Sequence, residues 1–174
     1  MRRSLAHTVL APAALLLFGA CGERPGEWDR PRAILGPIPL KDKVAYVDTA
    51  FDRVVVIDTR PDGAPGVPTI TTHAIGRRPL FAAPTPDRGR LAVVTRGQEA
   101  IHEGDIEQEP GLYVIDLDGN GPPLRYELGS PFDRLAVAAD GSVAVAYFSE
   151  AGPDAEGFFR NPNELAVLDL NQEP

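Results

Sequence analysis

One stretch of the chain places oxygen ligands at the spacing of a calcium-binding loop. Asp116, Asp118 and Asn120 alternate along it, Gly121 allows a sharp turn, and Glu127 follows as a closing carboxylate. This order matches the pattern D-x-[DN]-x-[DN]-G-x5-E, in which alternating oxygens surround the ion and a glutamate completes the shell. The first hypothesis for this stretch is therefore a calcium site.

The surrounding sequence supports a second interpretation of Asp116. A calcium loop of this kind lies between two helices, whereas residues 112–117 and 124–128 have the apolar pattern of strands. Asp58 and Asp169 end similar strands, but the turns after them lack the calcium pattern. An aspartate at this place can instead accept hydrogen bonds from the backbone of a hairpin turn. Both interpretations use the same carboxylate.

Two long acidic segments form the second candidate site. Residues 97–110 and 149–163 carry many carboxylates, whereas the matching connection near residue 50 has only about five residues. Long loops on a rigid scaffold commonly carry recognition, and we expect these two to lie side by side. The alternative is a pair of acidic surface loops that only increase solubility. The candidate binding residues are Glu103, Asp105, Glu107, Phe158 and Phe159.

The sequence offers little for catalysis. His102 lies beside Glu103 and Asp105, but no second histidine follows at the spacing of a helical metal site. His73 falls in an expected strand, where a structural role is favoured. The chain has no G-x-S-x-G nucleophile motif and no glycine-rich phosphate loop. We therefore predict no catalytic residues.

The elements that must position these residues form a repeat. Two types of apolar strand recur in a fixed order about every 50 residues. A third type leads into a glycine, and a weaker fourth type precedes a turn that contains Asp and Gly. The first type comprises residues 44–48, 91–95 and 143–147; the second 54–58, 112–116 and 165–169; the third 33–36, 72–76 and 126–129; and the fourth 80–84 and 132–138.

This repeat predicts the fold class. A unit of four short antiparallel strands is typical of a β-propeller blade, whose sheet must stack on its neighbours to bury both faces. The 18 prolines and 17 glycines favour the many tight turns that such a fold needs. We predict an all-β protein with about three four-stranded blades over residues 33–174. A single meander or β-sandwich is the alternative.

The number of strands also predicts where the first residues of the repeat pair. Residues 33–36 resemble the last strand of a unit, and the third unit ends near residue 170 without such a strand. We therefore expect residues 33–36 to complete the third blade. Three blades are too few to close on a central channel. The domain is then either part of a larger propeller or half of a ring that a homodimer completes.

The repeat resembles the YVTN-type propeller family, which is similar to lactonase-like and WD40-like propellers. The resemblance covers nearly all of residues 33–171 and implies a propeller fold. It implies no single activity, because propellers host many unrelated functions. A lactonase-like enzyme would need carboxylates and a metal around a central channel. The matching pieces are residues 54–59, Gly76, residues 86–93 and 112–117, Gly129 and residues 140–145.

Residues 1–20 have the features of an export signal. Arg2 and Arg3 precede an apolar segment, residues 10–18, that is too short to span a bilayer. Residues 17–21, LFGAC, resemble the signal motif of bacterial lipoproteins, although a phenylalanine stands where leucine is usual. The resemblance implies cleavage before Cys21 and lipidation of its thiol. An ordinary secretory signal is the alternative.

Charge narrows the range of partners. The chain has a formal charge of −8, and removal of residues 1–20 takes away two arginines and leaves −10. Nucleic acid and anionic membrane surfaces bind basic faces, so neither is expected to bind this protein directly. Membrane attachment would come through lipid on Cys21, the only cysteine. Residues 21–32 would then act as a Pro/Gly-rich tether.

Together these features predict a lipid-anchored protein of the bacterial cell envelope that faces the periplasm or the cell surface. We expect its propeller-type domain to bind a protein or small-molecule ligand, or to act as a scaffold, without catalysis. Two alternatives stay open, namely a lactonase-like envelope enzyme and a calcium-binding propeller. Calcium is the one cofactor that the sequence suggests.

Overall fold

The computed structural model describes residues 33–58, 68–100, 103–104, 107–119, 121–154, 157–172 and 174. The regular elements in these residues are all β-strands, which confirms the predicted all-β class, and every strand pair is antiparallel. Arg32–Pro174 form one compact unit. Within the described residues, no helix has the length and apolar character needed to cross a membrane. The expected signal and tether lie outside these residues.

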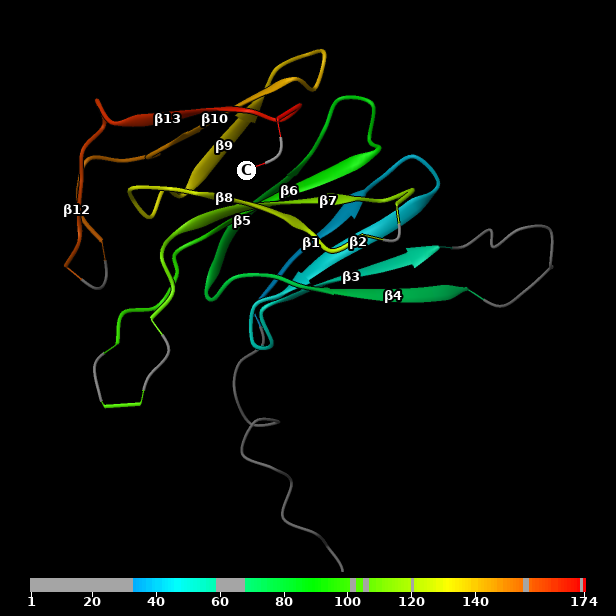
Figure 1. The fold of residues 1–174 in the computed structure, drawn as a ribbon, viewed down its shortest axis with the longest axis horizontal. Coiled ribbons are helices and arrows are strands. Elements are labelled where there is room, and N and C mark those ends of the chain that lie inside the picture. The colour runs from blue at the N-terminus through cyan, green and yellow to red at the C-terminus, as the bar shows by residue number, and fades with distance from the viewer. Residues whose placement is uncertain are drawn as a thin grey trace, which may run out of the picture. The chain divides into compact units, whose positions relative to one another are not determined.

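Two four-stranded sheets follow one another along the chain, each with its strands paired in sequence order (Figure 1). Their valine-, leucine- and alanine-rich strands suit sheets that are covered on both faces. The first sheet contains β1 (Ile34–Pro39), β2 (Lys43–Asp48), β3 (Arg53–Asp58) and β4 (Thr69–Ala74). The second contains β5 (Pro79–Pro84), β6 (Arg90–Thr95), β7 (Gly111–Asp116) and β8 (Leu124–Glu127).

The third sheet has three strands in the described part of the chain, in the order β9-β10-β13. A separate hairpin interrupts the connection between its second and third strands. Two sheets therefore have the predicted four strands, and none of the sheets closes on itself. The strands are β9 (Arg134–Val137), β10 (Val143–Tyr147) and β13 (Leu165–Asp169), and the hairpin is β11 (Gly152–Pro153) with β12 (Phe159–Arg160).

The predicted place of residues 33–36 in the third sheet is wrong. These residues enter β1, which pairs with β2 and places Leu35 opposite Val47. The connection between the two strands is short, and Leu40 N donates a hydrogen bond to Lys43 O over 3.0 Å. A local hairpin therefore forms in place of a pairing with the distant end of the chain, which would have to close a much longer loop.

In each of the three sheets, the second and third strands pair in the same register, so that cross-strand pairs of mostly apolar residues lie at equivalent positions. We call the face that carries these pairs the forward face, because the first two sheets turn it toward the next sheet along the chain. The opposite face is the rear face. The first set of forward pairs is Ala45 with Val56, Ala92 with Val114, and Val145 with Val167; the second is Val47 with Val54, Val94 with Leu112, and Tyr147 with Leu165.

The faces of β10 differ from those that sequence similarity predicts. In the sequence pattern, Val143 corresponds to Val44. In the structure, the preceding turn places Val143 at the strand position that Arg90 occupies in the second sheet. Ala138 N donates to Val143 O in the third sheet, as Thr85 N donates to Arg90 O in the second. A shift of one residue moves each side chain of a strand to the other face. The residues of β10 therefore point to the faces opposite to those of the residues that they resemble in β2 and β6.

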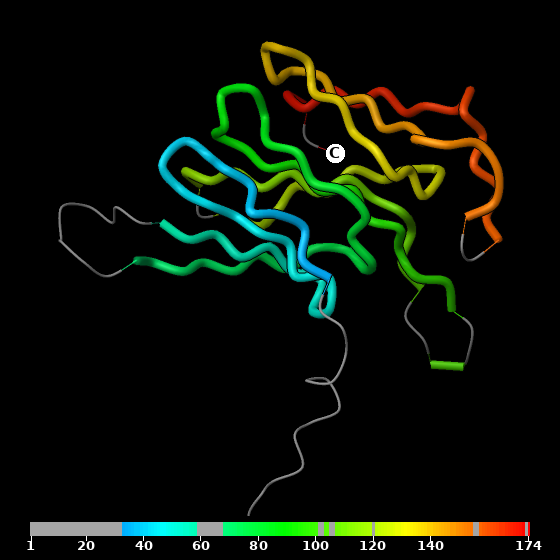
Figure 2. The backbone as a smooth tube through the Cα atoms, turned by 180° about the vertical axis from the view of Figure 1, so that it is seen from behind, coloured from blue at the N-terminus to red at the C-terminus, as the bar shows by residue number. Residues whose placement is uncertain are grey.

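Two apolar clusters hold the sheets together. In one, the forward face of the first sheet packs on the rear face of the second; in the other, the second sheet packs on the third in the same way. Leu91–Thr95 of β6 are consequently buried on both faces. The first strands of the sheets also lie close together, β1 with β5 and β5 with β9. Figure 2 shows the three sheets succeeding one another from blue to orange-red.

Candidate functional site

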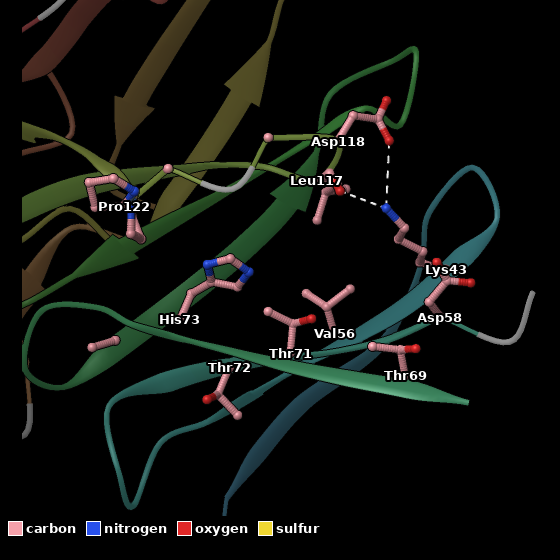
Figure 3. Close-up of a pocket in the computed structure, with 14 residues that line it drawn as sticks. Lys43, Val56, Asp58, Thr69, Thr71, Thr72, His73, Leu117, Asp118 and Pro122 are labelled. Atoms are coloured by element: carbon pink, nitrogen blue, oxygen red, sulfur yellow. Dashed lines mark hydrogen bonds and ion pairs between the residues drawn. The ribbon is translucent and has the colours of Figure 1, made fainter. Parts of the chain in front are cut away.

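A cleft of about 620 Å³ lies between the outer strands of the first sheet and the β7–β8 turn of the second (Figure 3). Strands β3 and β4 form one side, and residues 117–119 and 121–123 form the other. Small-molecule sites typically have volumes of about 300–1,000 Å³. The cleft is lined by Lys43, Asp58, Thr69, Thr71, His73 and Asp118, among others.

The cleft exists because β4 lacks the apolar pattern of its neighbours. Thr71 lies opposite Val56 and His73 opposite Val54, so both β4 residues belong to the forward face. The two valines are buried against the second sheet. Thr71 is exposed, and His73 is half-buried. The sheets therefore pack together at β3 and separate at β4.

Lys43 closes one end of the cleft. Its Nζ donates to the carbonyl oxygen of Leu117 over 2.6 Å and lies 3.5 Å from Asp118 Oδ1, as Figure 3 shows. The lysine side chain is only 16% exposed. Its contacts join the first sheet to the β7–β8 turn of the second. Because Asp118 compensates the ammonium charge, the cleft does not select strongly for an anion.

His73 supplies neutral hydrogen-bonding groups to the cleft. Desolvation by burial lowers the pKa of its imidazole below the ordinary value. The ring is therefore neutral at neutral pH, with one nitrogen as donor and the other as acceptor. Thr69 and Thr71 line the same space and can donate or accept through their hydroxyls. This side of the cleft suits a polar, uncharged molecule.

The predicted calcium loop forms a hairpin turn in its described residues. Asp116 Oδ1 accepts hydrogen bonds from the backbone nitrogens of Asp118 at 3.0 Å and Gly119 at 3.2 Å, which confirms the turn interpretation. Glu127 Oε1 accepts a hydrogen bond from Arg125 Nη1 over 2.9 Å. Among the described residues, no group of three or more His, Cys, Asp or Glu side chains is placed to hold a metal ion.

The two long loops lie side by side, as expected. Arg96 directly precedes the first loop and forms an ion pair with Asp154 of the second, between Arg96 Nη1 and Asp154 Oδ2. Both side chains are largely buried, with 16% and 14% exposure. Gln98 bridges Gln108 across the first loop, and the β11–β12 hairpin orders the second. The loops are thus attached to each other as well as to their sheets.

The described candidate residues of these loops have different environments. Glu103 and Glu107 are exposed, and Phe159 is 66% exposed. Phe158 is half-buried, and its ring centroid lies 5.9 Å from that of Phe148 in the core. The first three side chains are accessible to a partner, whereas Phe158 contributes to packing.

Several residues named in the sequence hypotheses lie outside the described residues. They are Asp105 and His102 of the first loop, Asn120 of the calcium pattern, and Cys21 of the lipoprotein motif. Their roles in binding, metal coordination and lipidation stay predictions.

Sequence reasoning predicted a strand at residues 72–76, which overlaps the end of β4, but missed the cleft beside it. The available signal was the composition of residues 69–74, TITTHA, which places Thr69, Thr71 and His73 on one strand face. At the equivalent face of β3, the sequence has valine. A polar row beside an apolar row indicates a sheet whose outer strand is not covered.

No protein-family model matches the chain, and no curated protein shows significant similarity to it. Its function must therefore be inferred from the cleft, the loops and the sheets.

Proposed function

We propose that this protein is a lipid-anchored, propeller-type binding module of the bacterial envelope, and that the cleft binds a small, neutral, hydroxyl-rich molecule. The cleft carries the proposal, because it combines a volume of about 620 Å³ with polar groups that line the same space. Binding without turnover agrees with its chemistry. Its charged groups are a lysine and two aspartates, and the lysine already has a partner.

The lining defines the chemistry of the ligand. Hydroxyl groups on a ligand can both donate and accept, as the threonine hydroxyls and the neutral imidazole require. Pro122 and Pro123 add an apolar surface opposite β4, which suits the C–H face of a sugar ring. A short neutral oligosaccharide has both properties.

Two features support the rest of the proposal. The successive sheets repeat one set of cross-strand pairs and pack forward face on rear face, as neighbouring propeller blades do. Cys21 follows an apolar segment with a basic start, as in bacterial lipoproteins. Labelling cells with a clickable fatty acid tests the anchor. Label is expected on the natural protein and not on Cys21→Ala, and an unlabelled natural protein would contradict lipidation.

Titration with maltotriose, cellotriose and triacetylchitotriose tests the cleft. One of these trisaccharides is expected to shift the His73 imidazole resonances in a saturable way. Loss of one hydroxyl hydrogen bond corresponds to about 1 kcal/mol, so Thr71→Val should raise the Kd by about fivefold. Tyr147→Phe is the matched control, because it removes a hydroxyl from the third sheet and should leave the Kd unchanged.

The same titration contains the result that would overturn the proposed ligand class. His73 resonances that do not respond to any of the three trisaccharides would reject it. An equal effect of Thr71→Val and Tyr147→Phe would place binding elsewhere. Hydrolysis of a lactone by the protein, lost in Asp58→Asn, would support the lactonase-like alternative instead.

A further inference from the structure

Within the described residues, each of the two end sheets has an outer face on which no other sheet packs and which carries exposed apolar side chains. On the rear face of the first sheet, Ile34 is 53% and Ile70 is 63% exposed. On the forward face of the third sheet, Leu165 is 58% and Val167 is 64% exposed. The cross-strand pairs place these residues on the outer faces, away from the second sheet. Exposed apolar side chains that gather on one face of a soluble domain commonly mark an interface.

The second sheet shows what covers such faces. Its rear pair Leu91 and Ile115 is buried against the first sheet, and its forward pair Ala92 and Val114 is buried against the third. One type of contact, forward face on rear face, thus occurs twice within the chain. Within the part of the chain that the structure describes, the rear face of the first sheet and the forward face of the third sheet take no part in such a contact.

At one cross-strand pair on each side, the outer faces carry apolar residues at the positions that make that contact. Val145 is half-buried and Val167 is exposed. The two occupy the register of Ala45 and Val56, which the first sheet packs on the second. On the other side, Val44 lies opposite Ile57 in the rear face of the first sheet, as Leu91 lies opposite Ile115 in the second.

The rear face of the first sheet also contains a hollow. Its volume is about 270 Å³, and it is lined by Ile34, Gly36, Pro37, Tyr46, Asp48 and Arg53. The Arg53 Nη2–Asp48 Oδ2 ion pair, 3.2 Å apart, borders it. Large apolar side chains such as those exposed on β13 could fill a hollow of this kind, and filled pockets are where interfaces gain most of their affinity.

From this match we propose that the occupant of both faces is a second copy of this chain. The forward face of the third sheet packs on the rear face of the first sheet of the partner, and the reverse contact closes a ring of six sheets. A head-to-tail contact closes a ring when its rotation fits and otherwise forms open chains. Six sheets fall within the roughly four to eight blades of closed propellers. This inference does not depend on the ligand of the cleft.

Paired cysteine variants of the full chain test this arrangement with a short bis-maleimide. Val44→Cys and Val167→Cys lie on the two different faces. Mixed in equal amounts, these two single variants should give a covalent dimer, whereas neither should do so alone. The double variant should stop at a dimer. The natural protein controls for any contribution from Cys21.

Every other outcome of the cross-linking experiment would overturn part of the proposal. Self-cross-linking of Val167→Cys alone would mean that like faces pair, which contradicts head-to-tail contact. A ladder of larger products from the double variant would indicate an open chain and contradict ring closure. No cross-linking, with a monomer mass in native mass spectrometry, would reject the second copy and leave these faces to another protein or to further sheets.

Charge substitutions supply an independent measurement. Val167→Asp buries a carboxylate in the proposed contact and should weaken dimerisation by at least tenfold. Leu124→Asp is the control, because Leu124 is 39% exposed on the second sheet and lies on neither end face. Equal weakening by both substitutions would contradict the proposed surface, and circular dichroism checks that both variants fold.

Discussion

Lys43 and Arg90 make the same contact in successive sheets. Each begins the second strand of its sheet, and each donates to the carbonyl oxygen of the residue that follows the third strand of the next sheet. Lys43 Nζ lies 2.6 Å from Leu117 O, and Arg90 Nη1 lies 3.0 Å from Leu170 O. A basic side chain thus joins each pair of adjacent sheets at the same place, beside the apolar contact.

Removing these donors should loosen the sheet pairs. Arg90 also donates to Gly141 O over 2.7 Å. Hydrogen bonds from charged donors contribute about 1.5–3 kcal/mol each, so Arg90→Met, which removes two of them, should lower the free energy of unfolding by about 3–6 kcal/mol. Lys43→Met, which removes one, should lower it by about 1.5–3 kcal/mol. Urea denaturation measures both values.

Arg88→Met is the matched control for Arg90→Met. Arg88 is exposed in the turn before β6, and a surface substitution of this kind should change stability by less than about 0.5 kcal/mol. Equal losses in the two variants would show that the carbonyl contacts contribute nothing specific.

The Arg96–Asp154 ion pair should couple the two long loops energetically. A double-mutant cycle with Arg96→Ala and Asp154→Ala should give a coupling energy of about 1–3 kcal/mol, because both side chains are largely buried. Asp154→Ala should cost more than Arg96→Ala, since Asp154 Oδ1 also accepts a hydrogen bond from Phe158 N over 2.9 Å.

A second cycle provides the comparison for this pair. Arg125 and Glu127 form an ion pair with 31% and 76% exposure. Exposed pairs contribute about 0–1 kcal/mol, so the Arg125–Glu127 coupling should be small and should vanish at high salt. A coupling energy for Arg96 and Asp154 no larger than this would mean that the loops are held by other contacts.

Acid should destabilise the turns at Asp87 and Asp140. Hydrogen bonds from Thr85 and Gly89 lower the pKa of Asp87, and those from Ser142 lower the pKa of Asp140. A lowered folded-state pKa means that the charged carboxylate stabilises the fold above the unfolded pKa. That contribution is lost as pH falls through the folded pKa, below about pH 4.

The double variant Asp87→Asn and Asp140→Asn tests this pH dependence. Asparagine keeps an acceptor oxygen but does not titrate in this range. The melting temperature of the natural protein should fall more steeply between about pH 5 and pH 2 than that of the variant. Parallel curves would show that other carboxylates account for acid unfolding. Asp42→Asn, on an exposed residue, is the control.

The sequence predicted the first two types of strand well because strand type depends on local pattern. Alternating apolar residues between Pro/Gly-rich turns predicted β6 at residues 91–95, and the structure has Arg90–Thr95. The length of the two long segments also predicted loops on one side of the sheets. The repeat also predicted that Asp116 accepts hydrogen bonds from the backbone of its turn. Asp169 ends the equivalent strand of the third sheet, and it likewise accepts a hydrogen bond from Asn171 N over 3.0 Å.

The pairing of strands was harder to predict because it depends on turns and on distant contacts. The turn at Leu40 decides that β1 pairs with β2, and the turn at Asp140 decides which face of the sheet each side chain of β10 occupies. The cleft depends on which outer strand stays uncovered, and only the packing of two sheets decides that. Nothing in the sequence around Lys43 indicated its hydrogen bond to Leu117, which lies 74 residues away.

The glycines that precede each new sheet resemble one another in sequence, but they meet different surroundings. A Cβ on Gly76 would lie 2.6 Å from Tyr113 Cε2 and 2.7 Å from Thr95 Oγ1. Both neighbours are buried, and Tyr113 OH accepts a hydrogen bond from Gln108 Nε2 over 3.1 Å, so the ring has little freedom to move. A Cβ on Gly129 would have no heavy atom within 4 Å.

Alanine substitutions at these two glycines should therefore have opposite effects. Overpacking typically costs about 1–3 kcal/mol, so Gly76→Ala should lower the free energy of unfolding by that amount. Gly129→Ala should raise it by up to about 1 kcal/mol, because alanine restricts the unfolded chain. Urea denaturation of both variants decides the matter. Similar losses at both positions would mean that the glycines are needed for their backbone conformation and not for the space beside Tyr113.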